Sequence, residues 1–148
     1  MKILKSSEKK GILNKLNEQY GISKIPYLIL KFGKEKLRIY SGTLPPNELK
    51  KLDNFIRIEN AGIYFAKQEG EKIRLTLDGI QSFKDQITKN ILEINDQQAK
   101  EWLKGNELYI KTDKNFKIIK NNEEFIGCGK SNGERITNFV PKNRRVKN

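Results

Sequence analysis

Short apolar runs separated by turn residues follow one another along the chain, and their spacing predicts both helices and strands. Residues 5–19 carry apolar side chains on one helical face, which predicts an opening helix with Ser6 or Ser7 as its cap and Gly21 as its end. Apolar runs without that spacing predict strands. In the first half of the chain we expect strands at 27–32, 36–40, 56–58, 63–67 and 72–77, and a short helix at 47–55 after Pro46.

In the second half, strand and helix signals alternate over a short distance. Residues 97–104 have the apolar spacing of a helix, with Asn95 or Asp96 as its cap and Gly105 as its end. One short helix among several short strands is typical of a small β-barrel-like module. The strands predicted around this helix are 91–94, 107–111, 115–120 and 125–129, with a turn at 121–122.

A polar stretch at 82–90 has little apolar periodicity, so we expect the boundary between two units there. The sequence therefore predicts an α+β protein. A small N-terminal α+β domain would occupy residues 1–85, and a C-terminal barrel-like domain would occupy residues 86–148. A chain of 148 residues is long enough to bury a real core, either as one domain or as two small ones.

Basic residues outnumber acidic ones by 30 to 18, and the net charge of +12 favours a polyanionic partner, nucleic acid more than a membrane surface. A lysine-rich composition also accompanies AT-rich genomes, so composition alone leaves both explanations open. The surplus is segregated, because residues 1–36 and 111–148 each carry a net charge of +6 while residues 37–110 are neutral. If the fold brings the two ends together, they form one basic face.

The chain contains few groups suited to catalysis. One cysteine excludes an internal disulfide, and the absence of histidine argues against a zinc site. Cys128 has no histidine to activate it and is expected to be a small packed side chain rather than a nucleophile. Carboxylates such as Asp78 and Asp85 are scattered, and no glycine-rich cofactor fingerprint is present. We therefore expect no enzymatic activity and no cofactor.

The apolar runs also bear on where the protein is found. No run approaches the roughly 18–20 residues needed to span a membrane. The start of the chain has no apolar segment of the kind found in signal peptides. We therefore expect a soluble, cytoplasmic protein with no membrane partner.

Residues 125–148 carry the strongest functional signal in the sequence. A short apolar strand runs into small residues at 127–129, a turn signal follows at 131–133, and the chain leaves in a basic tail. Small residues let another backbone come close, and arginines bind phosphate with two hydrogen bonds. The window thus predicts a strand edge that contacts an RNA backbone. Three of the six arginines of the chain lie here: Arg135, Arg144 and Arg145.

The order of strand, capped helix, Leu-Lys-Gly, strand and a late strand ending Ile-Gly-Cys-Gly-Lys resembles a PUA domain, an RNA-binding pseudobarrel of RNA-modifying enzymes. The matching residues are ILEINDQQAKEWLKGNELYI (91–110) and EFIGCGK (124–130). The ending GKSNGERITNFVPKNRRV is similar to that of small archaeal PUA-containing proteins grouped with Sun/Fmu-type 5-methylcytosine RNA methyltransferases. The resemblance covers roughly residues 88–146 and implies a β pseudobarrel for the C-terminal domain.

The resemblance also implies an RNA contact surface along the helix, the glycine-ended loop after it, the following strand and the final strand. Tail arginines add to this surface, and Tyr109 can lie outward as a platform for base stacking. Carried onto this chain, this surface comprises Lys100, Lys104, Gly105, Asn106 and Leu108 on one side and Gly127, Gly129, Lys130 and Arg135 on the other. From their charge in the basic tail, we add Arg144 and Arg145 to the expected RNA-binding residues.

Simpler interpretations of the same residues stay open. Lys100 and Lys104 also fit a solvated helix face, and Gly105 also fits a plain helix end. Arg135 and the two tail arginines also fit a disordered basic segment. Trp102 shares a face with apolar neighbours, so we expect it in the core.

The interpretation that joins these signals is a non-catalytic protein that binds structured RNA. We expect ribosomal RNA or a pre-ribosomal particle as its target, with tRNA next, and an accessory role in rRNA modification or ribosome biogenesis. Two alternatives remain. The chain is a component of an RNA-modifying enzyme with an active site in the N-terminal domain, or it is an adaptor that docks a partner methyltransferase through its neutral middle.

Overall fold

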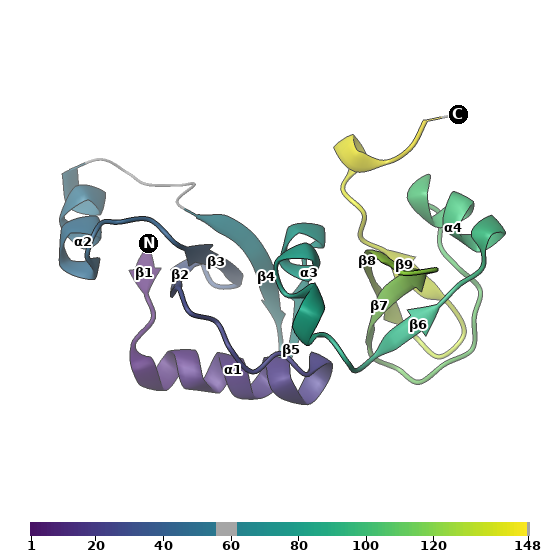
Figure 1. Ribbon diagram of the computed structural model, residues 1–148, viewed down its shortest axis with the longest axis horizontal. Helices are drawn as coiled ribbons and strands as arrows, with labels where there is room; N and C mark the ends of the chain where they lie inside the picture. The colour runs from purple at the N-terminus through teal and green to yellow at the C-terminus, as the bar shows by residue number, and fades with distance from the viewer. Residues whose placement is uncertain (56–61, 148) are drawn as a thin grey trace.

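The computed structural model describes residues 1–55 and 62–147, which form two sheets connected by short helices (Figure 1). The N-terminal elements are β1 (Lys2–Ile3), α1 (Ser6–Tyr20), β2 (Leu28–Phe32), β3 (Lys36–Tyr40), α2 (Pro46–Phe55), β4 (Ile63–Glu69), β5 (Lys72–Leu75), α3 (Leu77–Ser82) and the 3₁₀ turn η1 (Lys84–Gln86). The C-terminal elements are β6 (Ile91–Glu93), α4 (Asp96–Leu103), β7 (Phe116–Asn121), β8 (Glu124–Ser131), β9 (Ile136–Asn138) and the 3₁₀ turn η2 (Lys142–Arg144).

The first sheet has five strands in chain order, β1 to β5, and every neighbouring pair is antiparallel. Helix α1 packs along this sheet and buries Ile12, Leu16 and Tyr20 (Figure 1). The predicted helix and its stop at Gly21 are confirmed, because Gly21 has the left-handed φ of 89° that glycine tolerates.

The predicted serine cap of α1 is wrong, because the helix begins at Ser6 with Lys5 as its N-cap residue. The carboxylate of Glu8 accepts a hydrogen bond from the backbone N–H of Lys5 at 3.1 Å and one from the ammonium of Lys2 at 2.6 Å. These two hydrogen bonds lower the pKa of Glu8. The first-turn carboxylate of Glu8 therefore accepts the backbone N–H of the N-cap residue, and no serine hydroxyl caps the helix.

The second sheet has the order β6-β7-β8-β9 and is mixed. Strand β6 runs parallel to β7, whereas the pairs β7–β8 and β8–β9 are antiparallel. The connection between the parallel strands contains α4, which covers one face of the sheet. The helix starts with a capping box, in which Asn95 and Gln98 exchange hydrogen bonds of 2.8 and 2.9 Å between side chain and backbone, as the sequence predicts.

Two predicted strands are shorter in the structure than the sequence predicts. The strand predicted at 72–77 ends at Leu75, and the chain turns into α3, whose start is capped by the hydroxyl of Thr76. The strand predicted at 107–111 is reduced to a single bridge between Leu108 and Ile136. The strand predicted at 56–58 lies outside the described residues.

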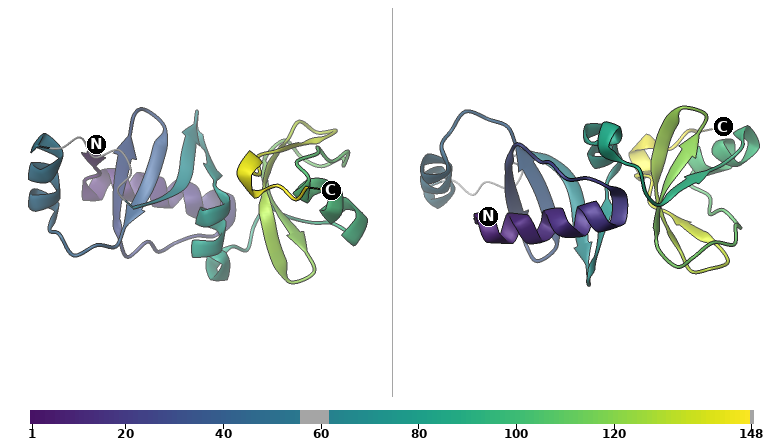
Figure 2. Two further views of the ribbon diagram at one scale, coloured as in Figure 1. Left: turned by 90° about the horizontal axis from the view of Figure 1, so that it is seen from above. Right: turned by 60° about the horizontal axis from the view of Figure 1, so that its bottom comes forward.

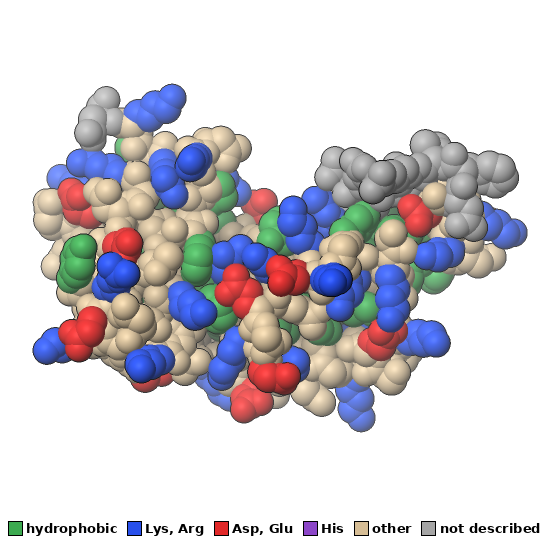
Figure 3. All heavy atoms as spheres, turned by 180° about the vertical axis from the view of Figure 1, so that it is seen from behind, with side chains coloured by type: hydrophobic (Ala, Val, Ile, Leu, Met, Phe, Trp, Pro, Cys, Tyr) green, Lys and Arg blue, Asp and Glu red, His purple; other side chains and the backbone are tan. Residues whose placement is uncertain are grey.

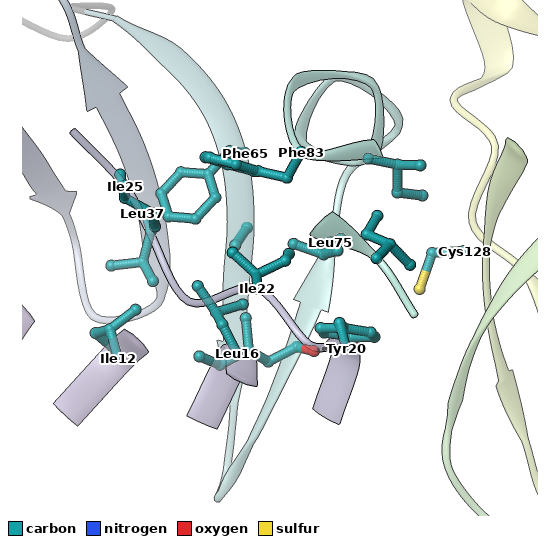
Figure 4. Close-up of a cluster of buried hydrophobic side chains, with 14 of the residues drawn as sticks. Ile12, Leu16, Tyr20, Ile22, Ile25, Leu37, Phe65, Leu75, Phe83 and Cys128 are labelled. Atoms are coloured by element: carbon teal, nitrogen blue, oxygen red, sulfur yellow. Dashed lines mark hydrogen bonds between the residues drawn. The ribbon is translucent and has the colours of Figure 1, made fainter. Parts of the chain in front are cut away.

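One hydrophobic core crosses from the first sheet to the second. Tyr20 of α1, Leu75 of β5 and Cys128 of β8 lie in one buried cluster (Figure 4). Phe116 of β7 belongs to the same cluster. Cys128 is buried as predicted, and this burial raises the pKa of its thiol to about 12. The two sheets are therefore joined by apolar packing as well as by the chain.

Polar contacts tie the segment between the two sheets to α1, and α1 to β5. The side-chain amide of Asn90 donates to the carbonyl of Gln19 at 2.6 Å, and the side-chain carbonyl of Gln19 accepts from the backbone N–H of Ile73 at 2.8 Å. The hydroxyl of Tyr20 donates to the carbonyl of Ile73. The segment predicted as a domain boundary thus lies between two sheets that contact each other directly, and the domain division itself stays a prediction.

The fold does not bring the two basic ends of the chain together at the termini. The N-terminus lies in the first sheet and the C-terminus at the far side of the second, toward opposite ends of the long axis (Figures 1 and 2). On the face drawn in Figure 3, Lys and Arg side chains are spread among acidic ones. The basic face that would follow from convergence of the ends is therefore not formed there. Among residues 1–55 and 62–147, no helix has the length and apolar character needed to cross a membrane.

Candidate nucleic-acid interface

The end of α4 is a tight turn that is fixed by hydrogen bonds from a neighbouring strand. Gly105 has a φ of 99°, a left-handed conformation that favours glycine. The side-chain amide of Asn138, on β9, donates to the carbonyl of Trp102 at 2.7 Å and to that of Asn106 at 2.9 Å. Because both bonds tie the turn to the sheet, the backbone from Lys104 to Asn106 is held in one place.

An open groove of about 680 Å³ lies beside this turn. Its floor includes Leu108, which is buried and exchanges backbone hydrogen bonds of 3.2 and 2.7 Å with Ile136. Its edge carries Tyr109, whose side chain points outward with 81% of its surface exposed, as the stacking hypothesis requires. The groove is lined by Gln97, Gln98, Glu101, Gly105, Asn106, Glu107, Leu108 and Tyr109.

Two cations at the rim of the groove are paired with the two carboxylates that line it. The ammonium of Lys104 lies 3.6 Å from Glu101, and the guanidinium of Arg135 lies 3.3 Å from Glu107. All four side chains are at least a third exposed, and such surface pairs contribute only about 0–1 kcal/mol. A phosphate group can therefore replace either carboxylate at little cost. Lys100 lies on the exposed side of α4 and has no ion pair within the described part of the chain.

The tail contacts the rest of the molecule as far as Val146, whose backbone N–H donates to the carbonyl of Leu103 at 2.8 Å. The guanidinium of Arg145 packs over Gly105, where an added Cβ would lie 2.5 Å from its Nε, and this Nε donates to the carbonyl of Val140 at 3.0 Å. The guanidinium of Arg144 pairs with Asp78 of α3 at 2.8 Å. The alternative of a disordered basic tail is therefore wrong for these two arginines.

Gly127 and Gly129 lie under Trp102 and not at an open strand edge. A Cβ on Gly127 would lie 2.8 Å from the indole nitrogen of Trp102, and a Cβ on Gly129 would lie 2.4 Å from Ile136. Trp102 is fully buried, as predicted, and its indole N–H donates to the carbonyl of Ile126 at 3.0 Å. The predicted strand edge is wrong, because β8 pairs with a neighbour on both sides. The two glycines make room for the indole.

Lys130 lies on the other face of the same strand. Its ammonium is 5.5 Å from the ring centroid of Phe116, and it lines a different cavity. The structure therefore divides the predicted residues into groups. Gly105, Asn106 and Leu108 line the groove. Lys104, Arg135 and Arg145 each contact a residue that lines it. Gly127 and Gly129 pack against Trp102, Lys100 lies on an exposed helix face, and Lys130 and Arg144 lie elsewhere.

Sequence reasoning missed the carboxylate partners and the residue that fixes the turn. The three-residue spacing of Glu101 and Lys104 on a helix was a usable signal for an ion pair. Glu107 and Arg135 are far apart in the sequence, and Asn138 had no local pattern to mark it. These contacts follow from the bridge between Leu108 and Ile136, which brings the two segments together.

Comparison with known proteins agrees with this geometry. Residues 89–146 match the family described as the Methyltransferase RsmF PUA domain. No curated protein matches the chain. The C-terminal unit is therefore similar to the PUA domains of Sun/Fmu-type RNA methyltransferases, and the resemblance found in the sequence is confirmed for that unit. The PUA domain is an RNA-binding domain, and the α+β class with a C-terminal β pseudobarrel is confirmed as well.

Proposed function

We propose that the chain binds structured RNA at the groove beside α4, as a non-catalytic accessory factor in rRNA modification or ribosome biogenesis. The observation that carries the proposal is that Lys104, Arg135 and Arg145 each contact a residue that lines one groove, inside a domain that matches an RNA-binding family. Cations that converge from a helix end, a strand turn and the tail are suited to successive phosphates of one RNA strand.

The proposed mechanism combines phosphate neutralisation with stacking. A phosphate displaces Glu101 from Lys104 or Glu107 from Arg135, because those exposed pairs are weak. Arginine then binds the phosphate with two parallel hydrogen bonds. The exposed ring of Tyr109 offers a face for a base that is not paired, and such stacking contributes about 1–3 kcal/mol per base.

Ribosomal RNA or a pre-ribosomal particle is the target that we propose first, and tRNA second. The support is the match to a PUA domain of a methyltransferase family, together with the net charge of +12. A non-catalytic role is supported by Cys128, because a buried thiol with a pKa raised to about 12 does not supply a thiolate near neutral pH. The setting that we propose is the cytoplasm.

A second candidate function is an adaptor that docks an RNA-modifying enzyme, in particular a partner methyltransferase. The match to a PUA domain described as that of a methyltransferase favours it. If this is correct, the chain and its methyltransferase remain together on size-exclusion chromatography after nuclease treatment. Separation of the two after nuclease treatment would leave RNA binding as the link between them.

The groove is tested by charge reversal on its two sides. Lys104→Glu and Arg135→Glu should each weaken binding of a short RNA stem-loop by about 1–3 kcal/mol, the range for charge-assisted contacts. The double variant should lose less than the sum if both cations hold one RNA segment. Fluorescence anisotropy with labelled RNA measures all three.

The matched control is Lys34→Glu, which makes the same charge change in the exposed β2–β3 turn. It should leave binding nearly unchanged. Equal losses in all three single variants would place the RNA surface outside the groove. Melting temperatures should stay close to that of the wild type, because surface substitutions usually change stability by no more than about 0.5 kcal/mol.

A further inference from the structure

A second cavity, of about 380 Å³, lies where the β4–β5 hairpin meets the second sheet. Its volume is in the range of ligand pockets, about 300–1,000 Å³. It shares no lining residue with the groove beside α4. The hairpin contributes Glu69 and Lys72, and the second sheet with its loops contributes Lys114, Asn115, Phe116, Lys130, Ser131, Asn132 and Thr137.

Three lysines from separate segments converge on this cavity. Lys72 comes from β5, Lys114 from the loop before β7, and Lys130 from β8. None of these three ammonium groups pairs with a carboxylate in the parts of the chain that the structure describes. Three cations that line one cavity without a paired carboxylate in the described chain favour an anion as its ligand.

The single carboxylate that lines the cavity is already engaged. Glu69 lies 3.7 Å from the ammonium of Lys67 and 3.6 Å from the guanidinium of Arg74. That guanidinium also lies 4.3 Å from the ring centroid of Phe139. Because Glu69 is occupied by cations from its own sheet, it is not the counter-charge for the three lysines of the cavity.

The cavity also offers an apolar surface and neutral polar groups. Phe116 is among the residues that line it, and its ring packs 6.3 Å, centroid to centroid, from that of Phe139. The side-chain oxygen of Asn132 accepts two backbone hydrogen bonds at 2.9 Å, which leaves its NH₂ group without an acceptor among the described residues. The side chain of Thr137 is exposed. Apolar carbons, hydrogen-bonding groups and cations together fit a base and its phosphate.

The turn between β8 and β9 connects the cavity with the groove. Asn132 lines the cavity, and Arg135, three residues later, pairs with Glu107 at the rim of the groove. A strand of RNA at the groove therefore reaches the cavity by passing over one turn. We infer that the cavity binds an unpaired nucleotide of the RNA held at the groove, with its phosphate on Lys72, Lys114 and Lys130. This inference rests on the proposed function.

The test compares one stem-loop RNA in two forms, blunt-ended and with a single-stranded 3′ oligouridine tail. Lys72→Glu and Lys114→Glu should each lower affinity for the tailed form about tenfold, as expected for a charge-assisted phosphate contact. Both variants should change affinity for the blunt form by less than about twofold, and Lys34→Glu should leave both forms unchanged. Equal losses on both forms, or no loss on either, overturn the inference.

Two further arms separate this inference from the proposed function. Arg135→Glu should weaken binding of both RNA forms. If Arg135→Glu changes neither, while Lys72→Glu still weakens the tailed form, the groove proposal fails and the cavity stands. Titration with free uridine monophosphate tests whether the ligand of the cavity is a free nucleotide and not RNA. The backbone amide signals of Asn132 and Thr137 report the binding. Saturable shifts with no gain in affinity from the RNA tail would assign the cavity to a free nucleotide and overturn the RNA inference.

Discussion

The groove beside α4 and the cavity beside the β4–β5 hairpin both have cations at their edges, but these cations differ in what they already contact. At the groove, Lys104 and Arg135 each face a carboxylate. At the cavity, Lys72 and Lys114 face none among the described residues. A phosphate must displace a carboxylate at the groove, whereas at the cavity it meets lysines for which the described chain supplies no carboxylate partner to displace. Net charge alone does not report this difference, because both sites contribute to the same +12.

The largest effect should come from removing the indole on which the groove is built. Trp102→Ala should lower the free energy of unfolding by about 3–5 kcal/mol, because it empties a fully buried site and loses the hydrogen bond to Ile126. Urea unfolding measures this. Tyr109→Ala, at the exposed edge of the groove, should change stability by about 0.5 kcal/mol or less and weaken RNA binding instead. Similar stability losses in the two variants would contradict the assignment of one aromatic to the core and the other to the surface.

A smaller effect is expected from salt. Affinity for the tailed stem-loop should fall about a hundredfold between 50 and 200 mM salt, since several phosphates are neutralised when groove and cavity are both filled. The blunt form, which fills the groove alone, should show a shallower dependence. Anisotropy titrations at a series of salt concentrations measure both slopes. Equal slopes would remove the distinction between the two sites.

A buried lysine with a carboxylate partner should contribute more to stability than the lysines of the cavity, which have no such partner among the described residues. The ammonium of Lys117 is buried, 2.5 Å from Asp113 and 3.3 Å from the side-chain oxygen of Asn90. Asp113→Asn should therefore lower the free energy of unfolding by about 1–2 kcal/mol, a value reduced by the exposure of the carboxylate. Lys114→Glu, at a neighbouring lysine with no partner, is the control and should leave stability nearly unchanged.

The same pair predicts a pH dependence. The hydrogen bond from Lys117, with a second from Asn115, holds the pKa of Asp113 well below its ordinary value. The stability that this carboxylate contributes is therefore complete above its ordinary pKa of about 3.9 and is lost as the pH falls below that value. The wild type should lose stability on acidification below about pH 4 by more than Asp113→Asn does. Parallel curves for the two proteins would show that the pair contributes nothing.

The smallest change in stability is expected from a substitution in the C-terminal tail. Arg144→Ala should change the free energy of unfolding by about 0–1 kcal/mol, because the pair with Asp78 is exposed on both sides. A double-mutant cycle with Asp78→Ala isolates the coupling between the two side chains. A coupling well above about 1 kcal/mol would mean that the tail fixes the second sheet against α3 more strongly than a surface ion pair allows.

Local patterns predicted the helices α1, α2 and α4 and most strands of this fold. The caps and stops of α1 and α4 include Asn95, Gly21 and Gly105, residues whose chemistry acts within a few positions of themselves. The helix α3 was missed because the apolar alternation up to Leu77 continues a strand pattern past Thr76, which is where the helix cap lies. The parallel pairing of β6 with β7 was not predicted either, since the strands lie far apart in the sequence.

The candidate site could be predicted in part. The resemblance to a PUA domain pointed to the loop after α4, and Gly105 and Asn106 of that loop line the groove. It could not show that Gly127 and Gly129 make room for Trp102, because that contact joins α4 to a strand about 25 residues later and depends on the face that each residue of β8 presents. Lys130 follows Gly129 directly and therefore points to the opposite face of the sheet.

The hydrogen bonds at the end of α4 have an electrostatic consequence. The C-terminus of a helix carries the negative end of its dipole, which would repel a phosphate in the groove beside it. Here the last carbonyls already have donors: those of Glu101 and Leu103 accept from the backbone N–H groups of Asn106 and Val146, and that of Trp102 accepts from the amide of Asn138. Part of the dipole field is thus neutralised by the protein itself, so an RNA strand approaching the groove meets the rim cations with less opposition from the helix.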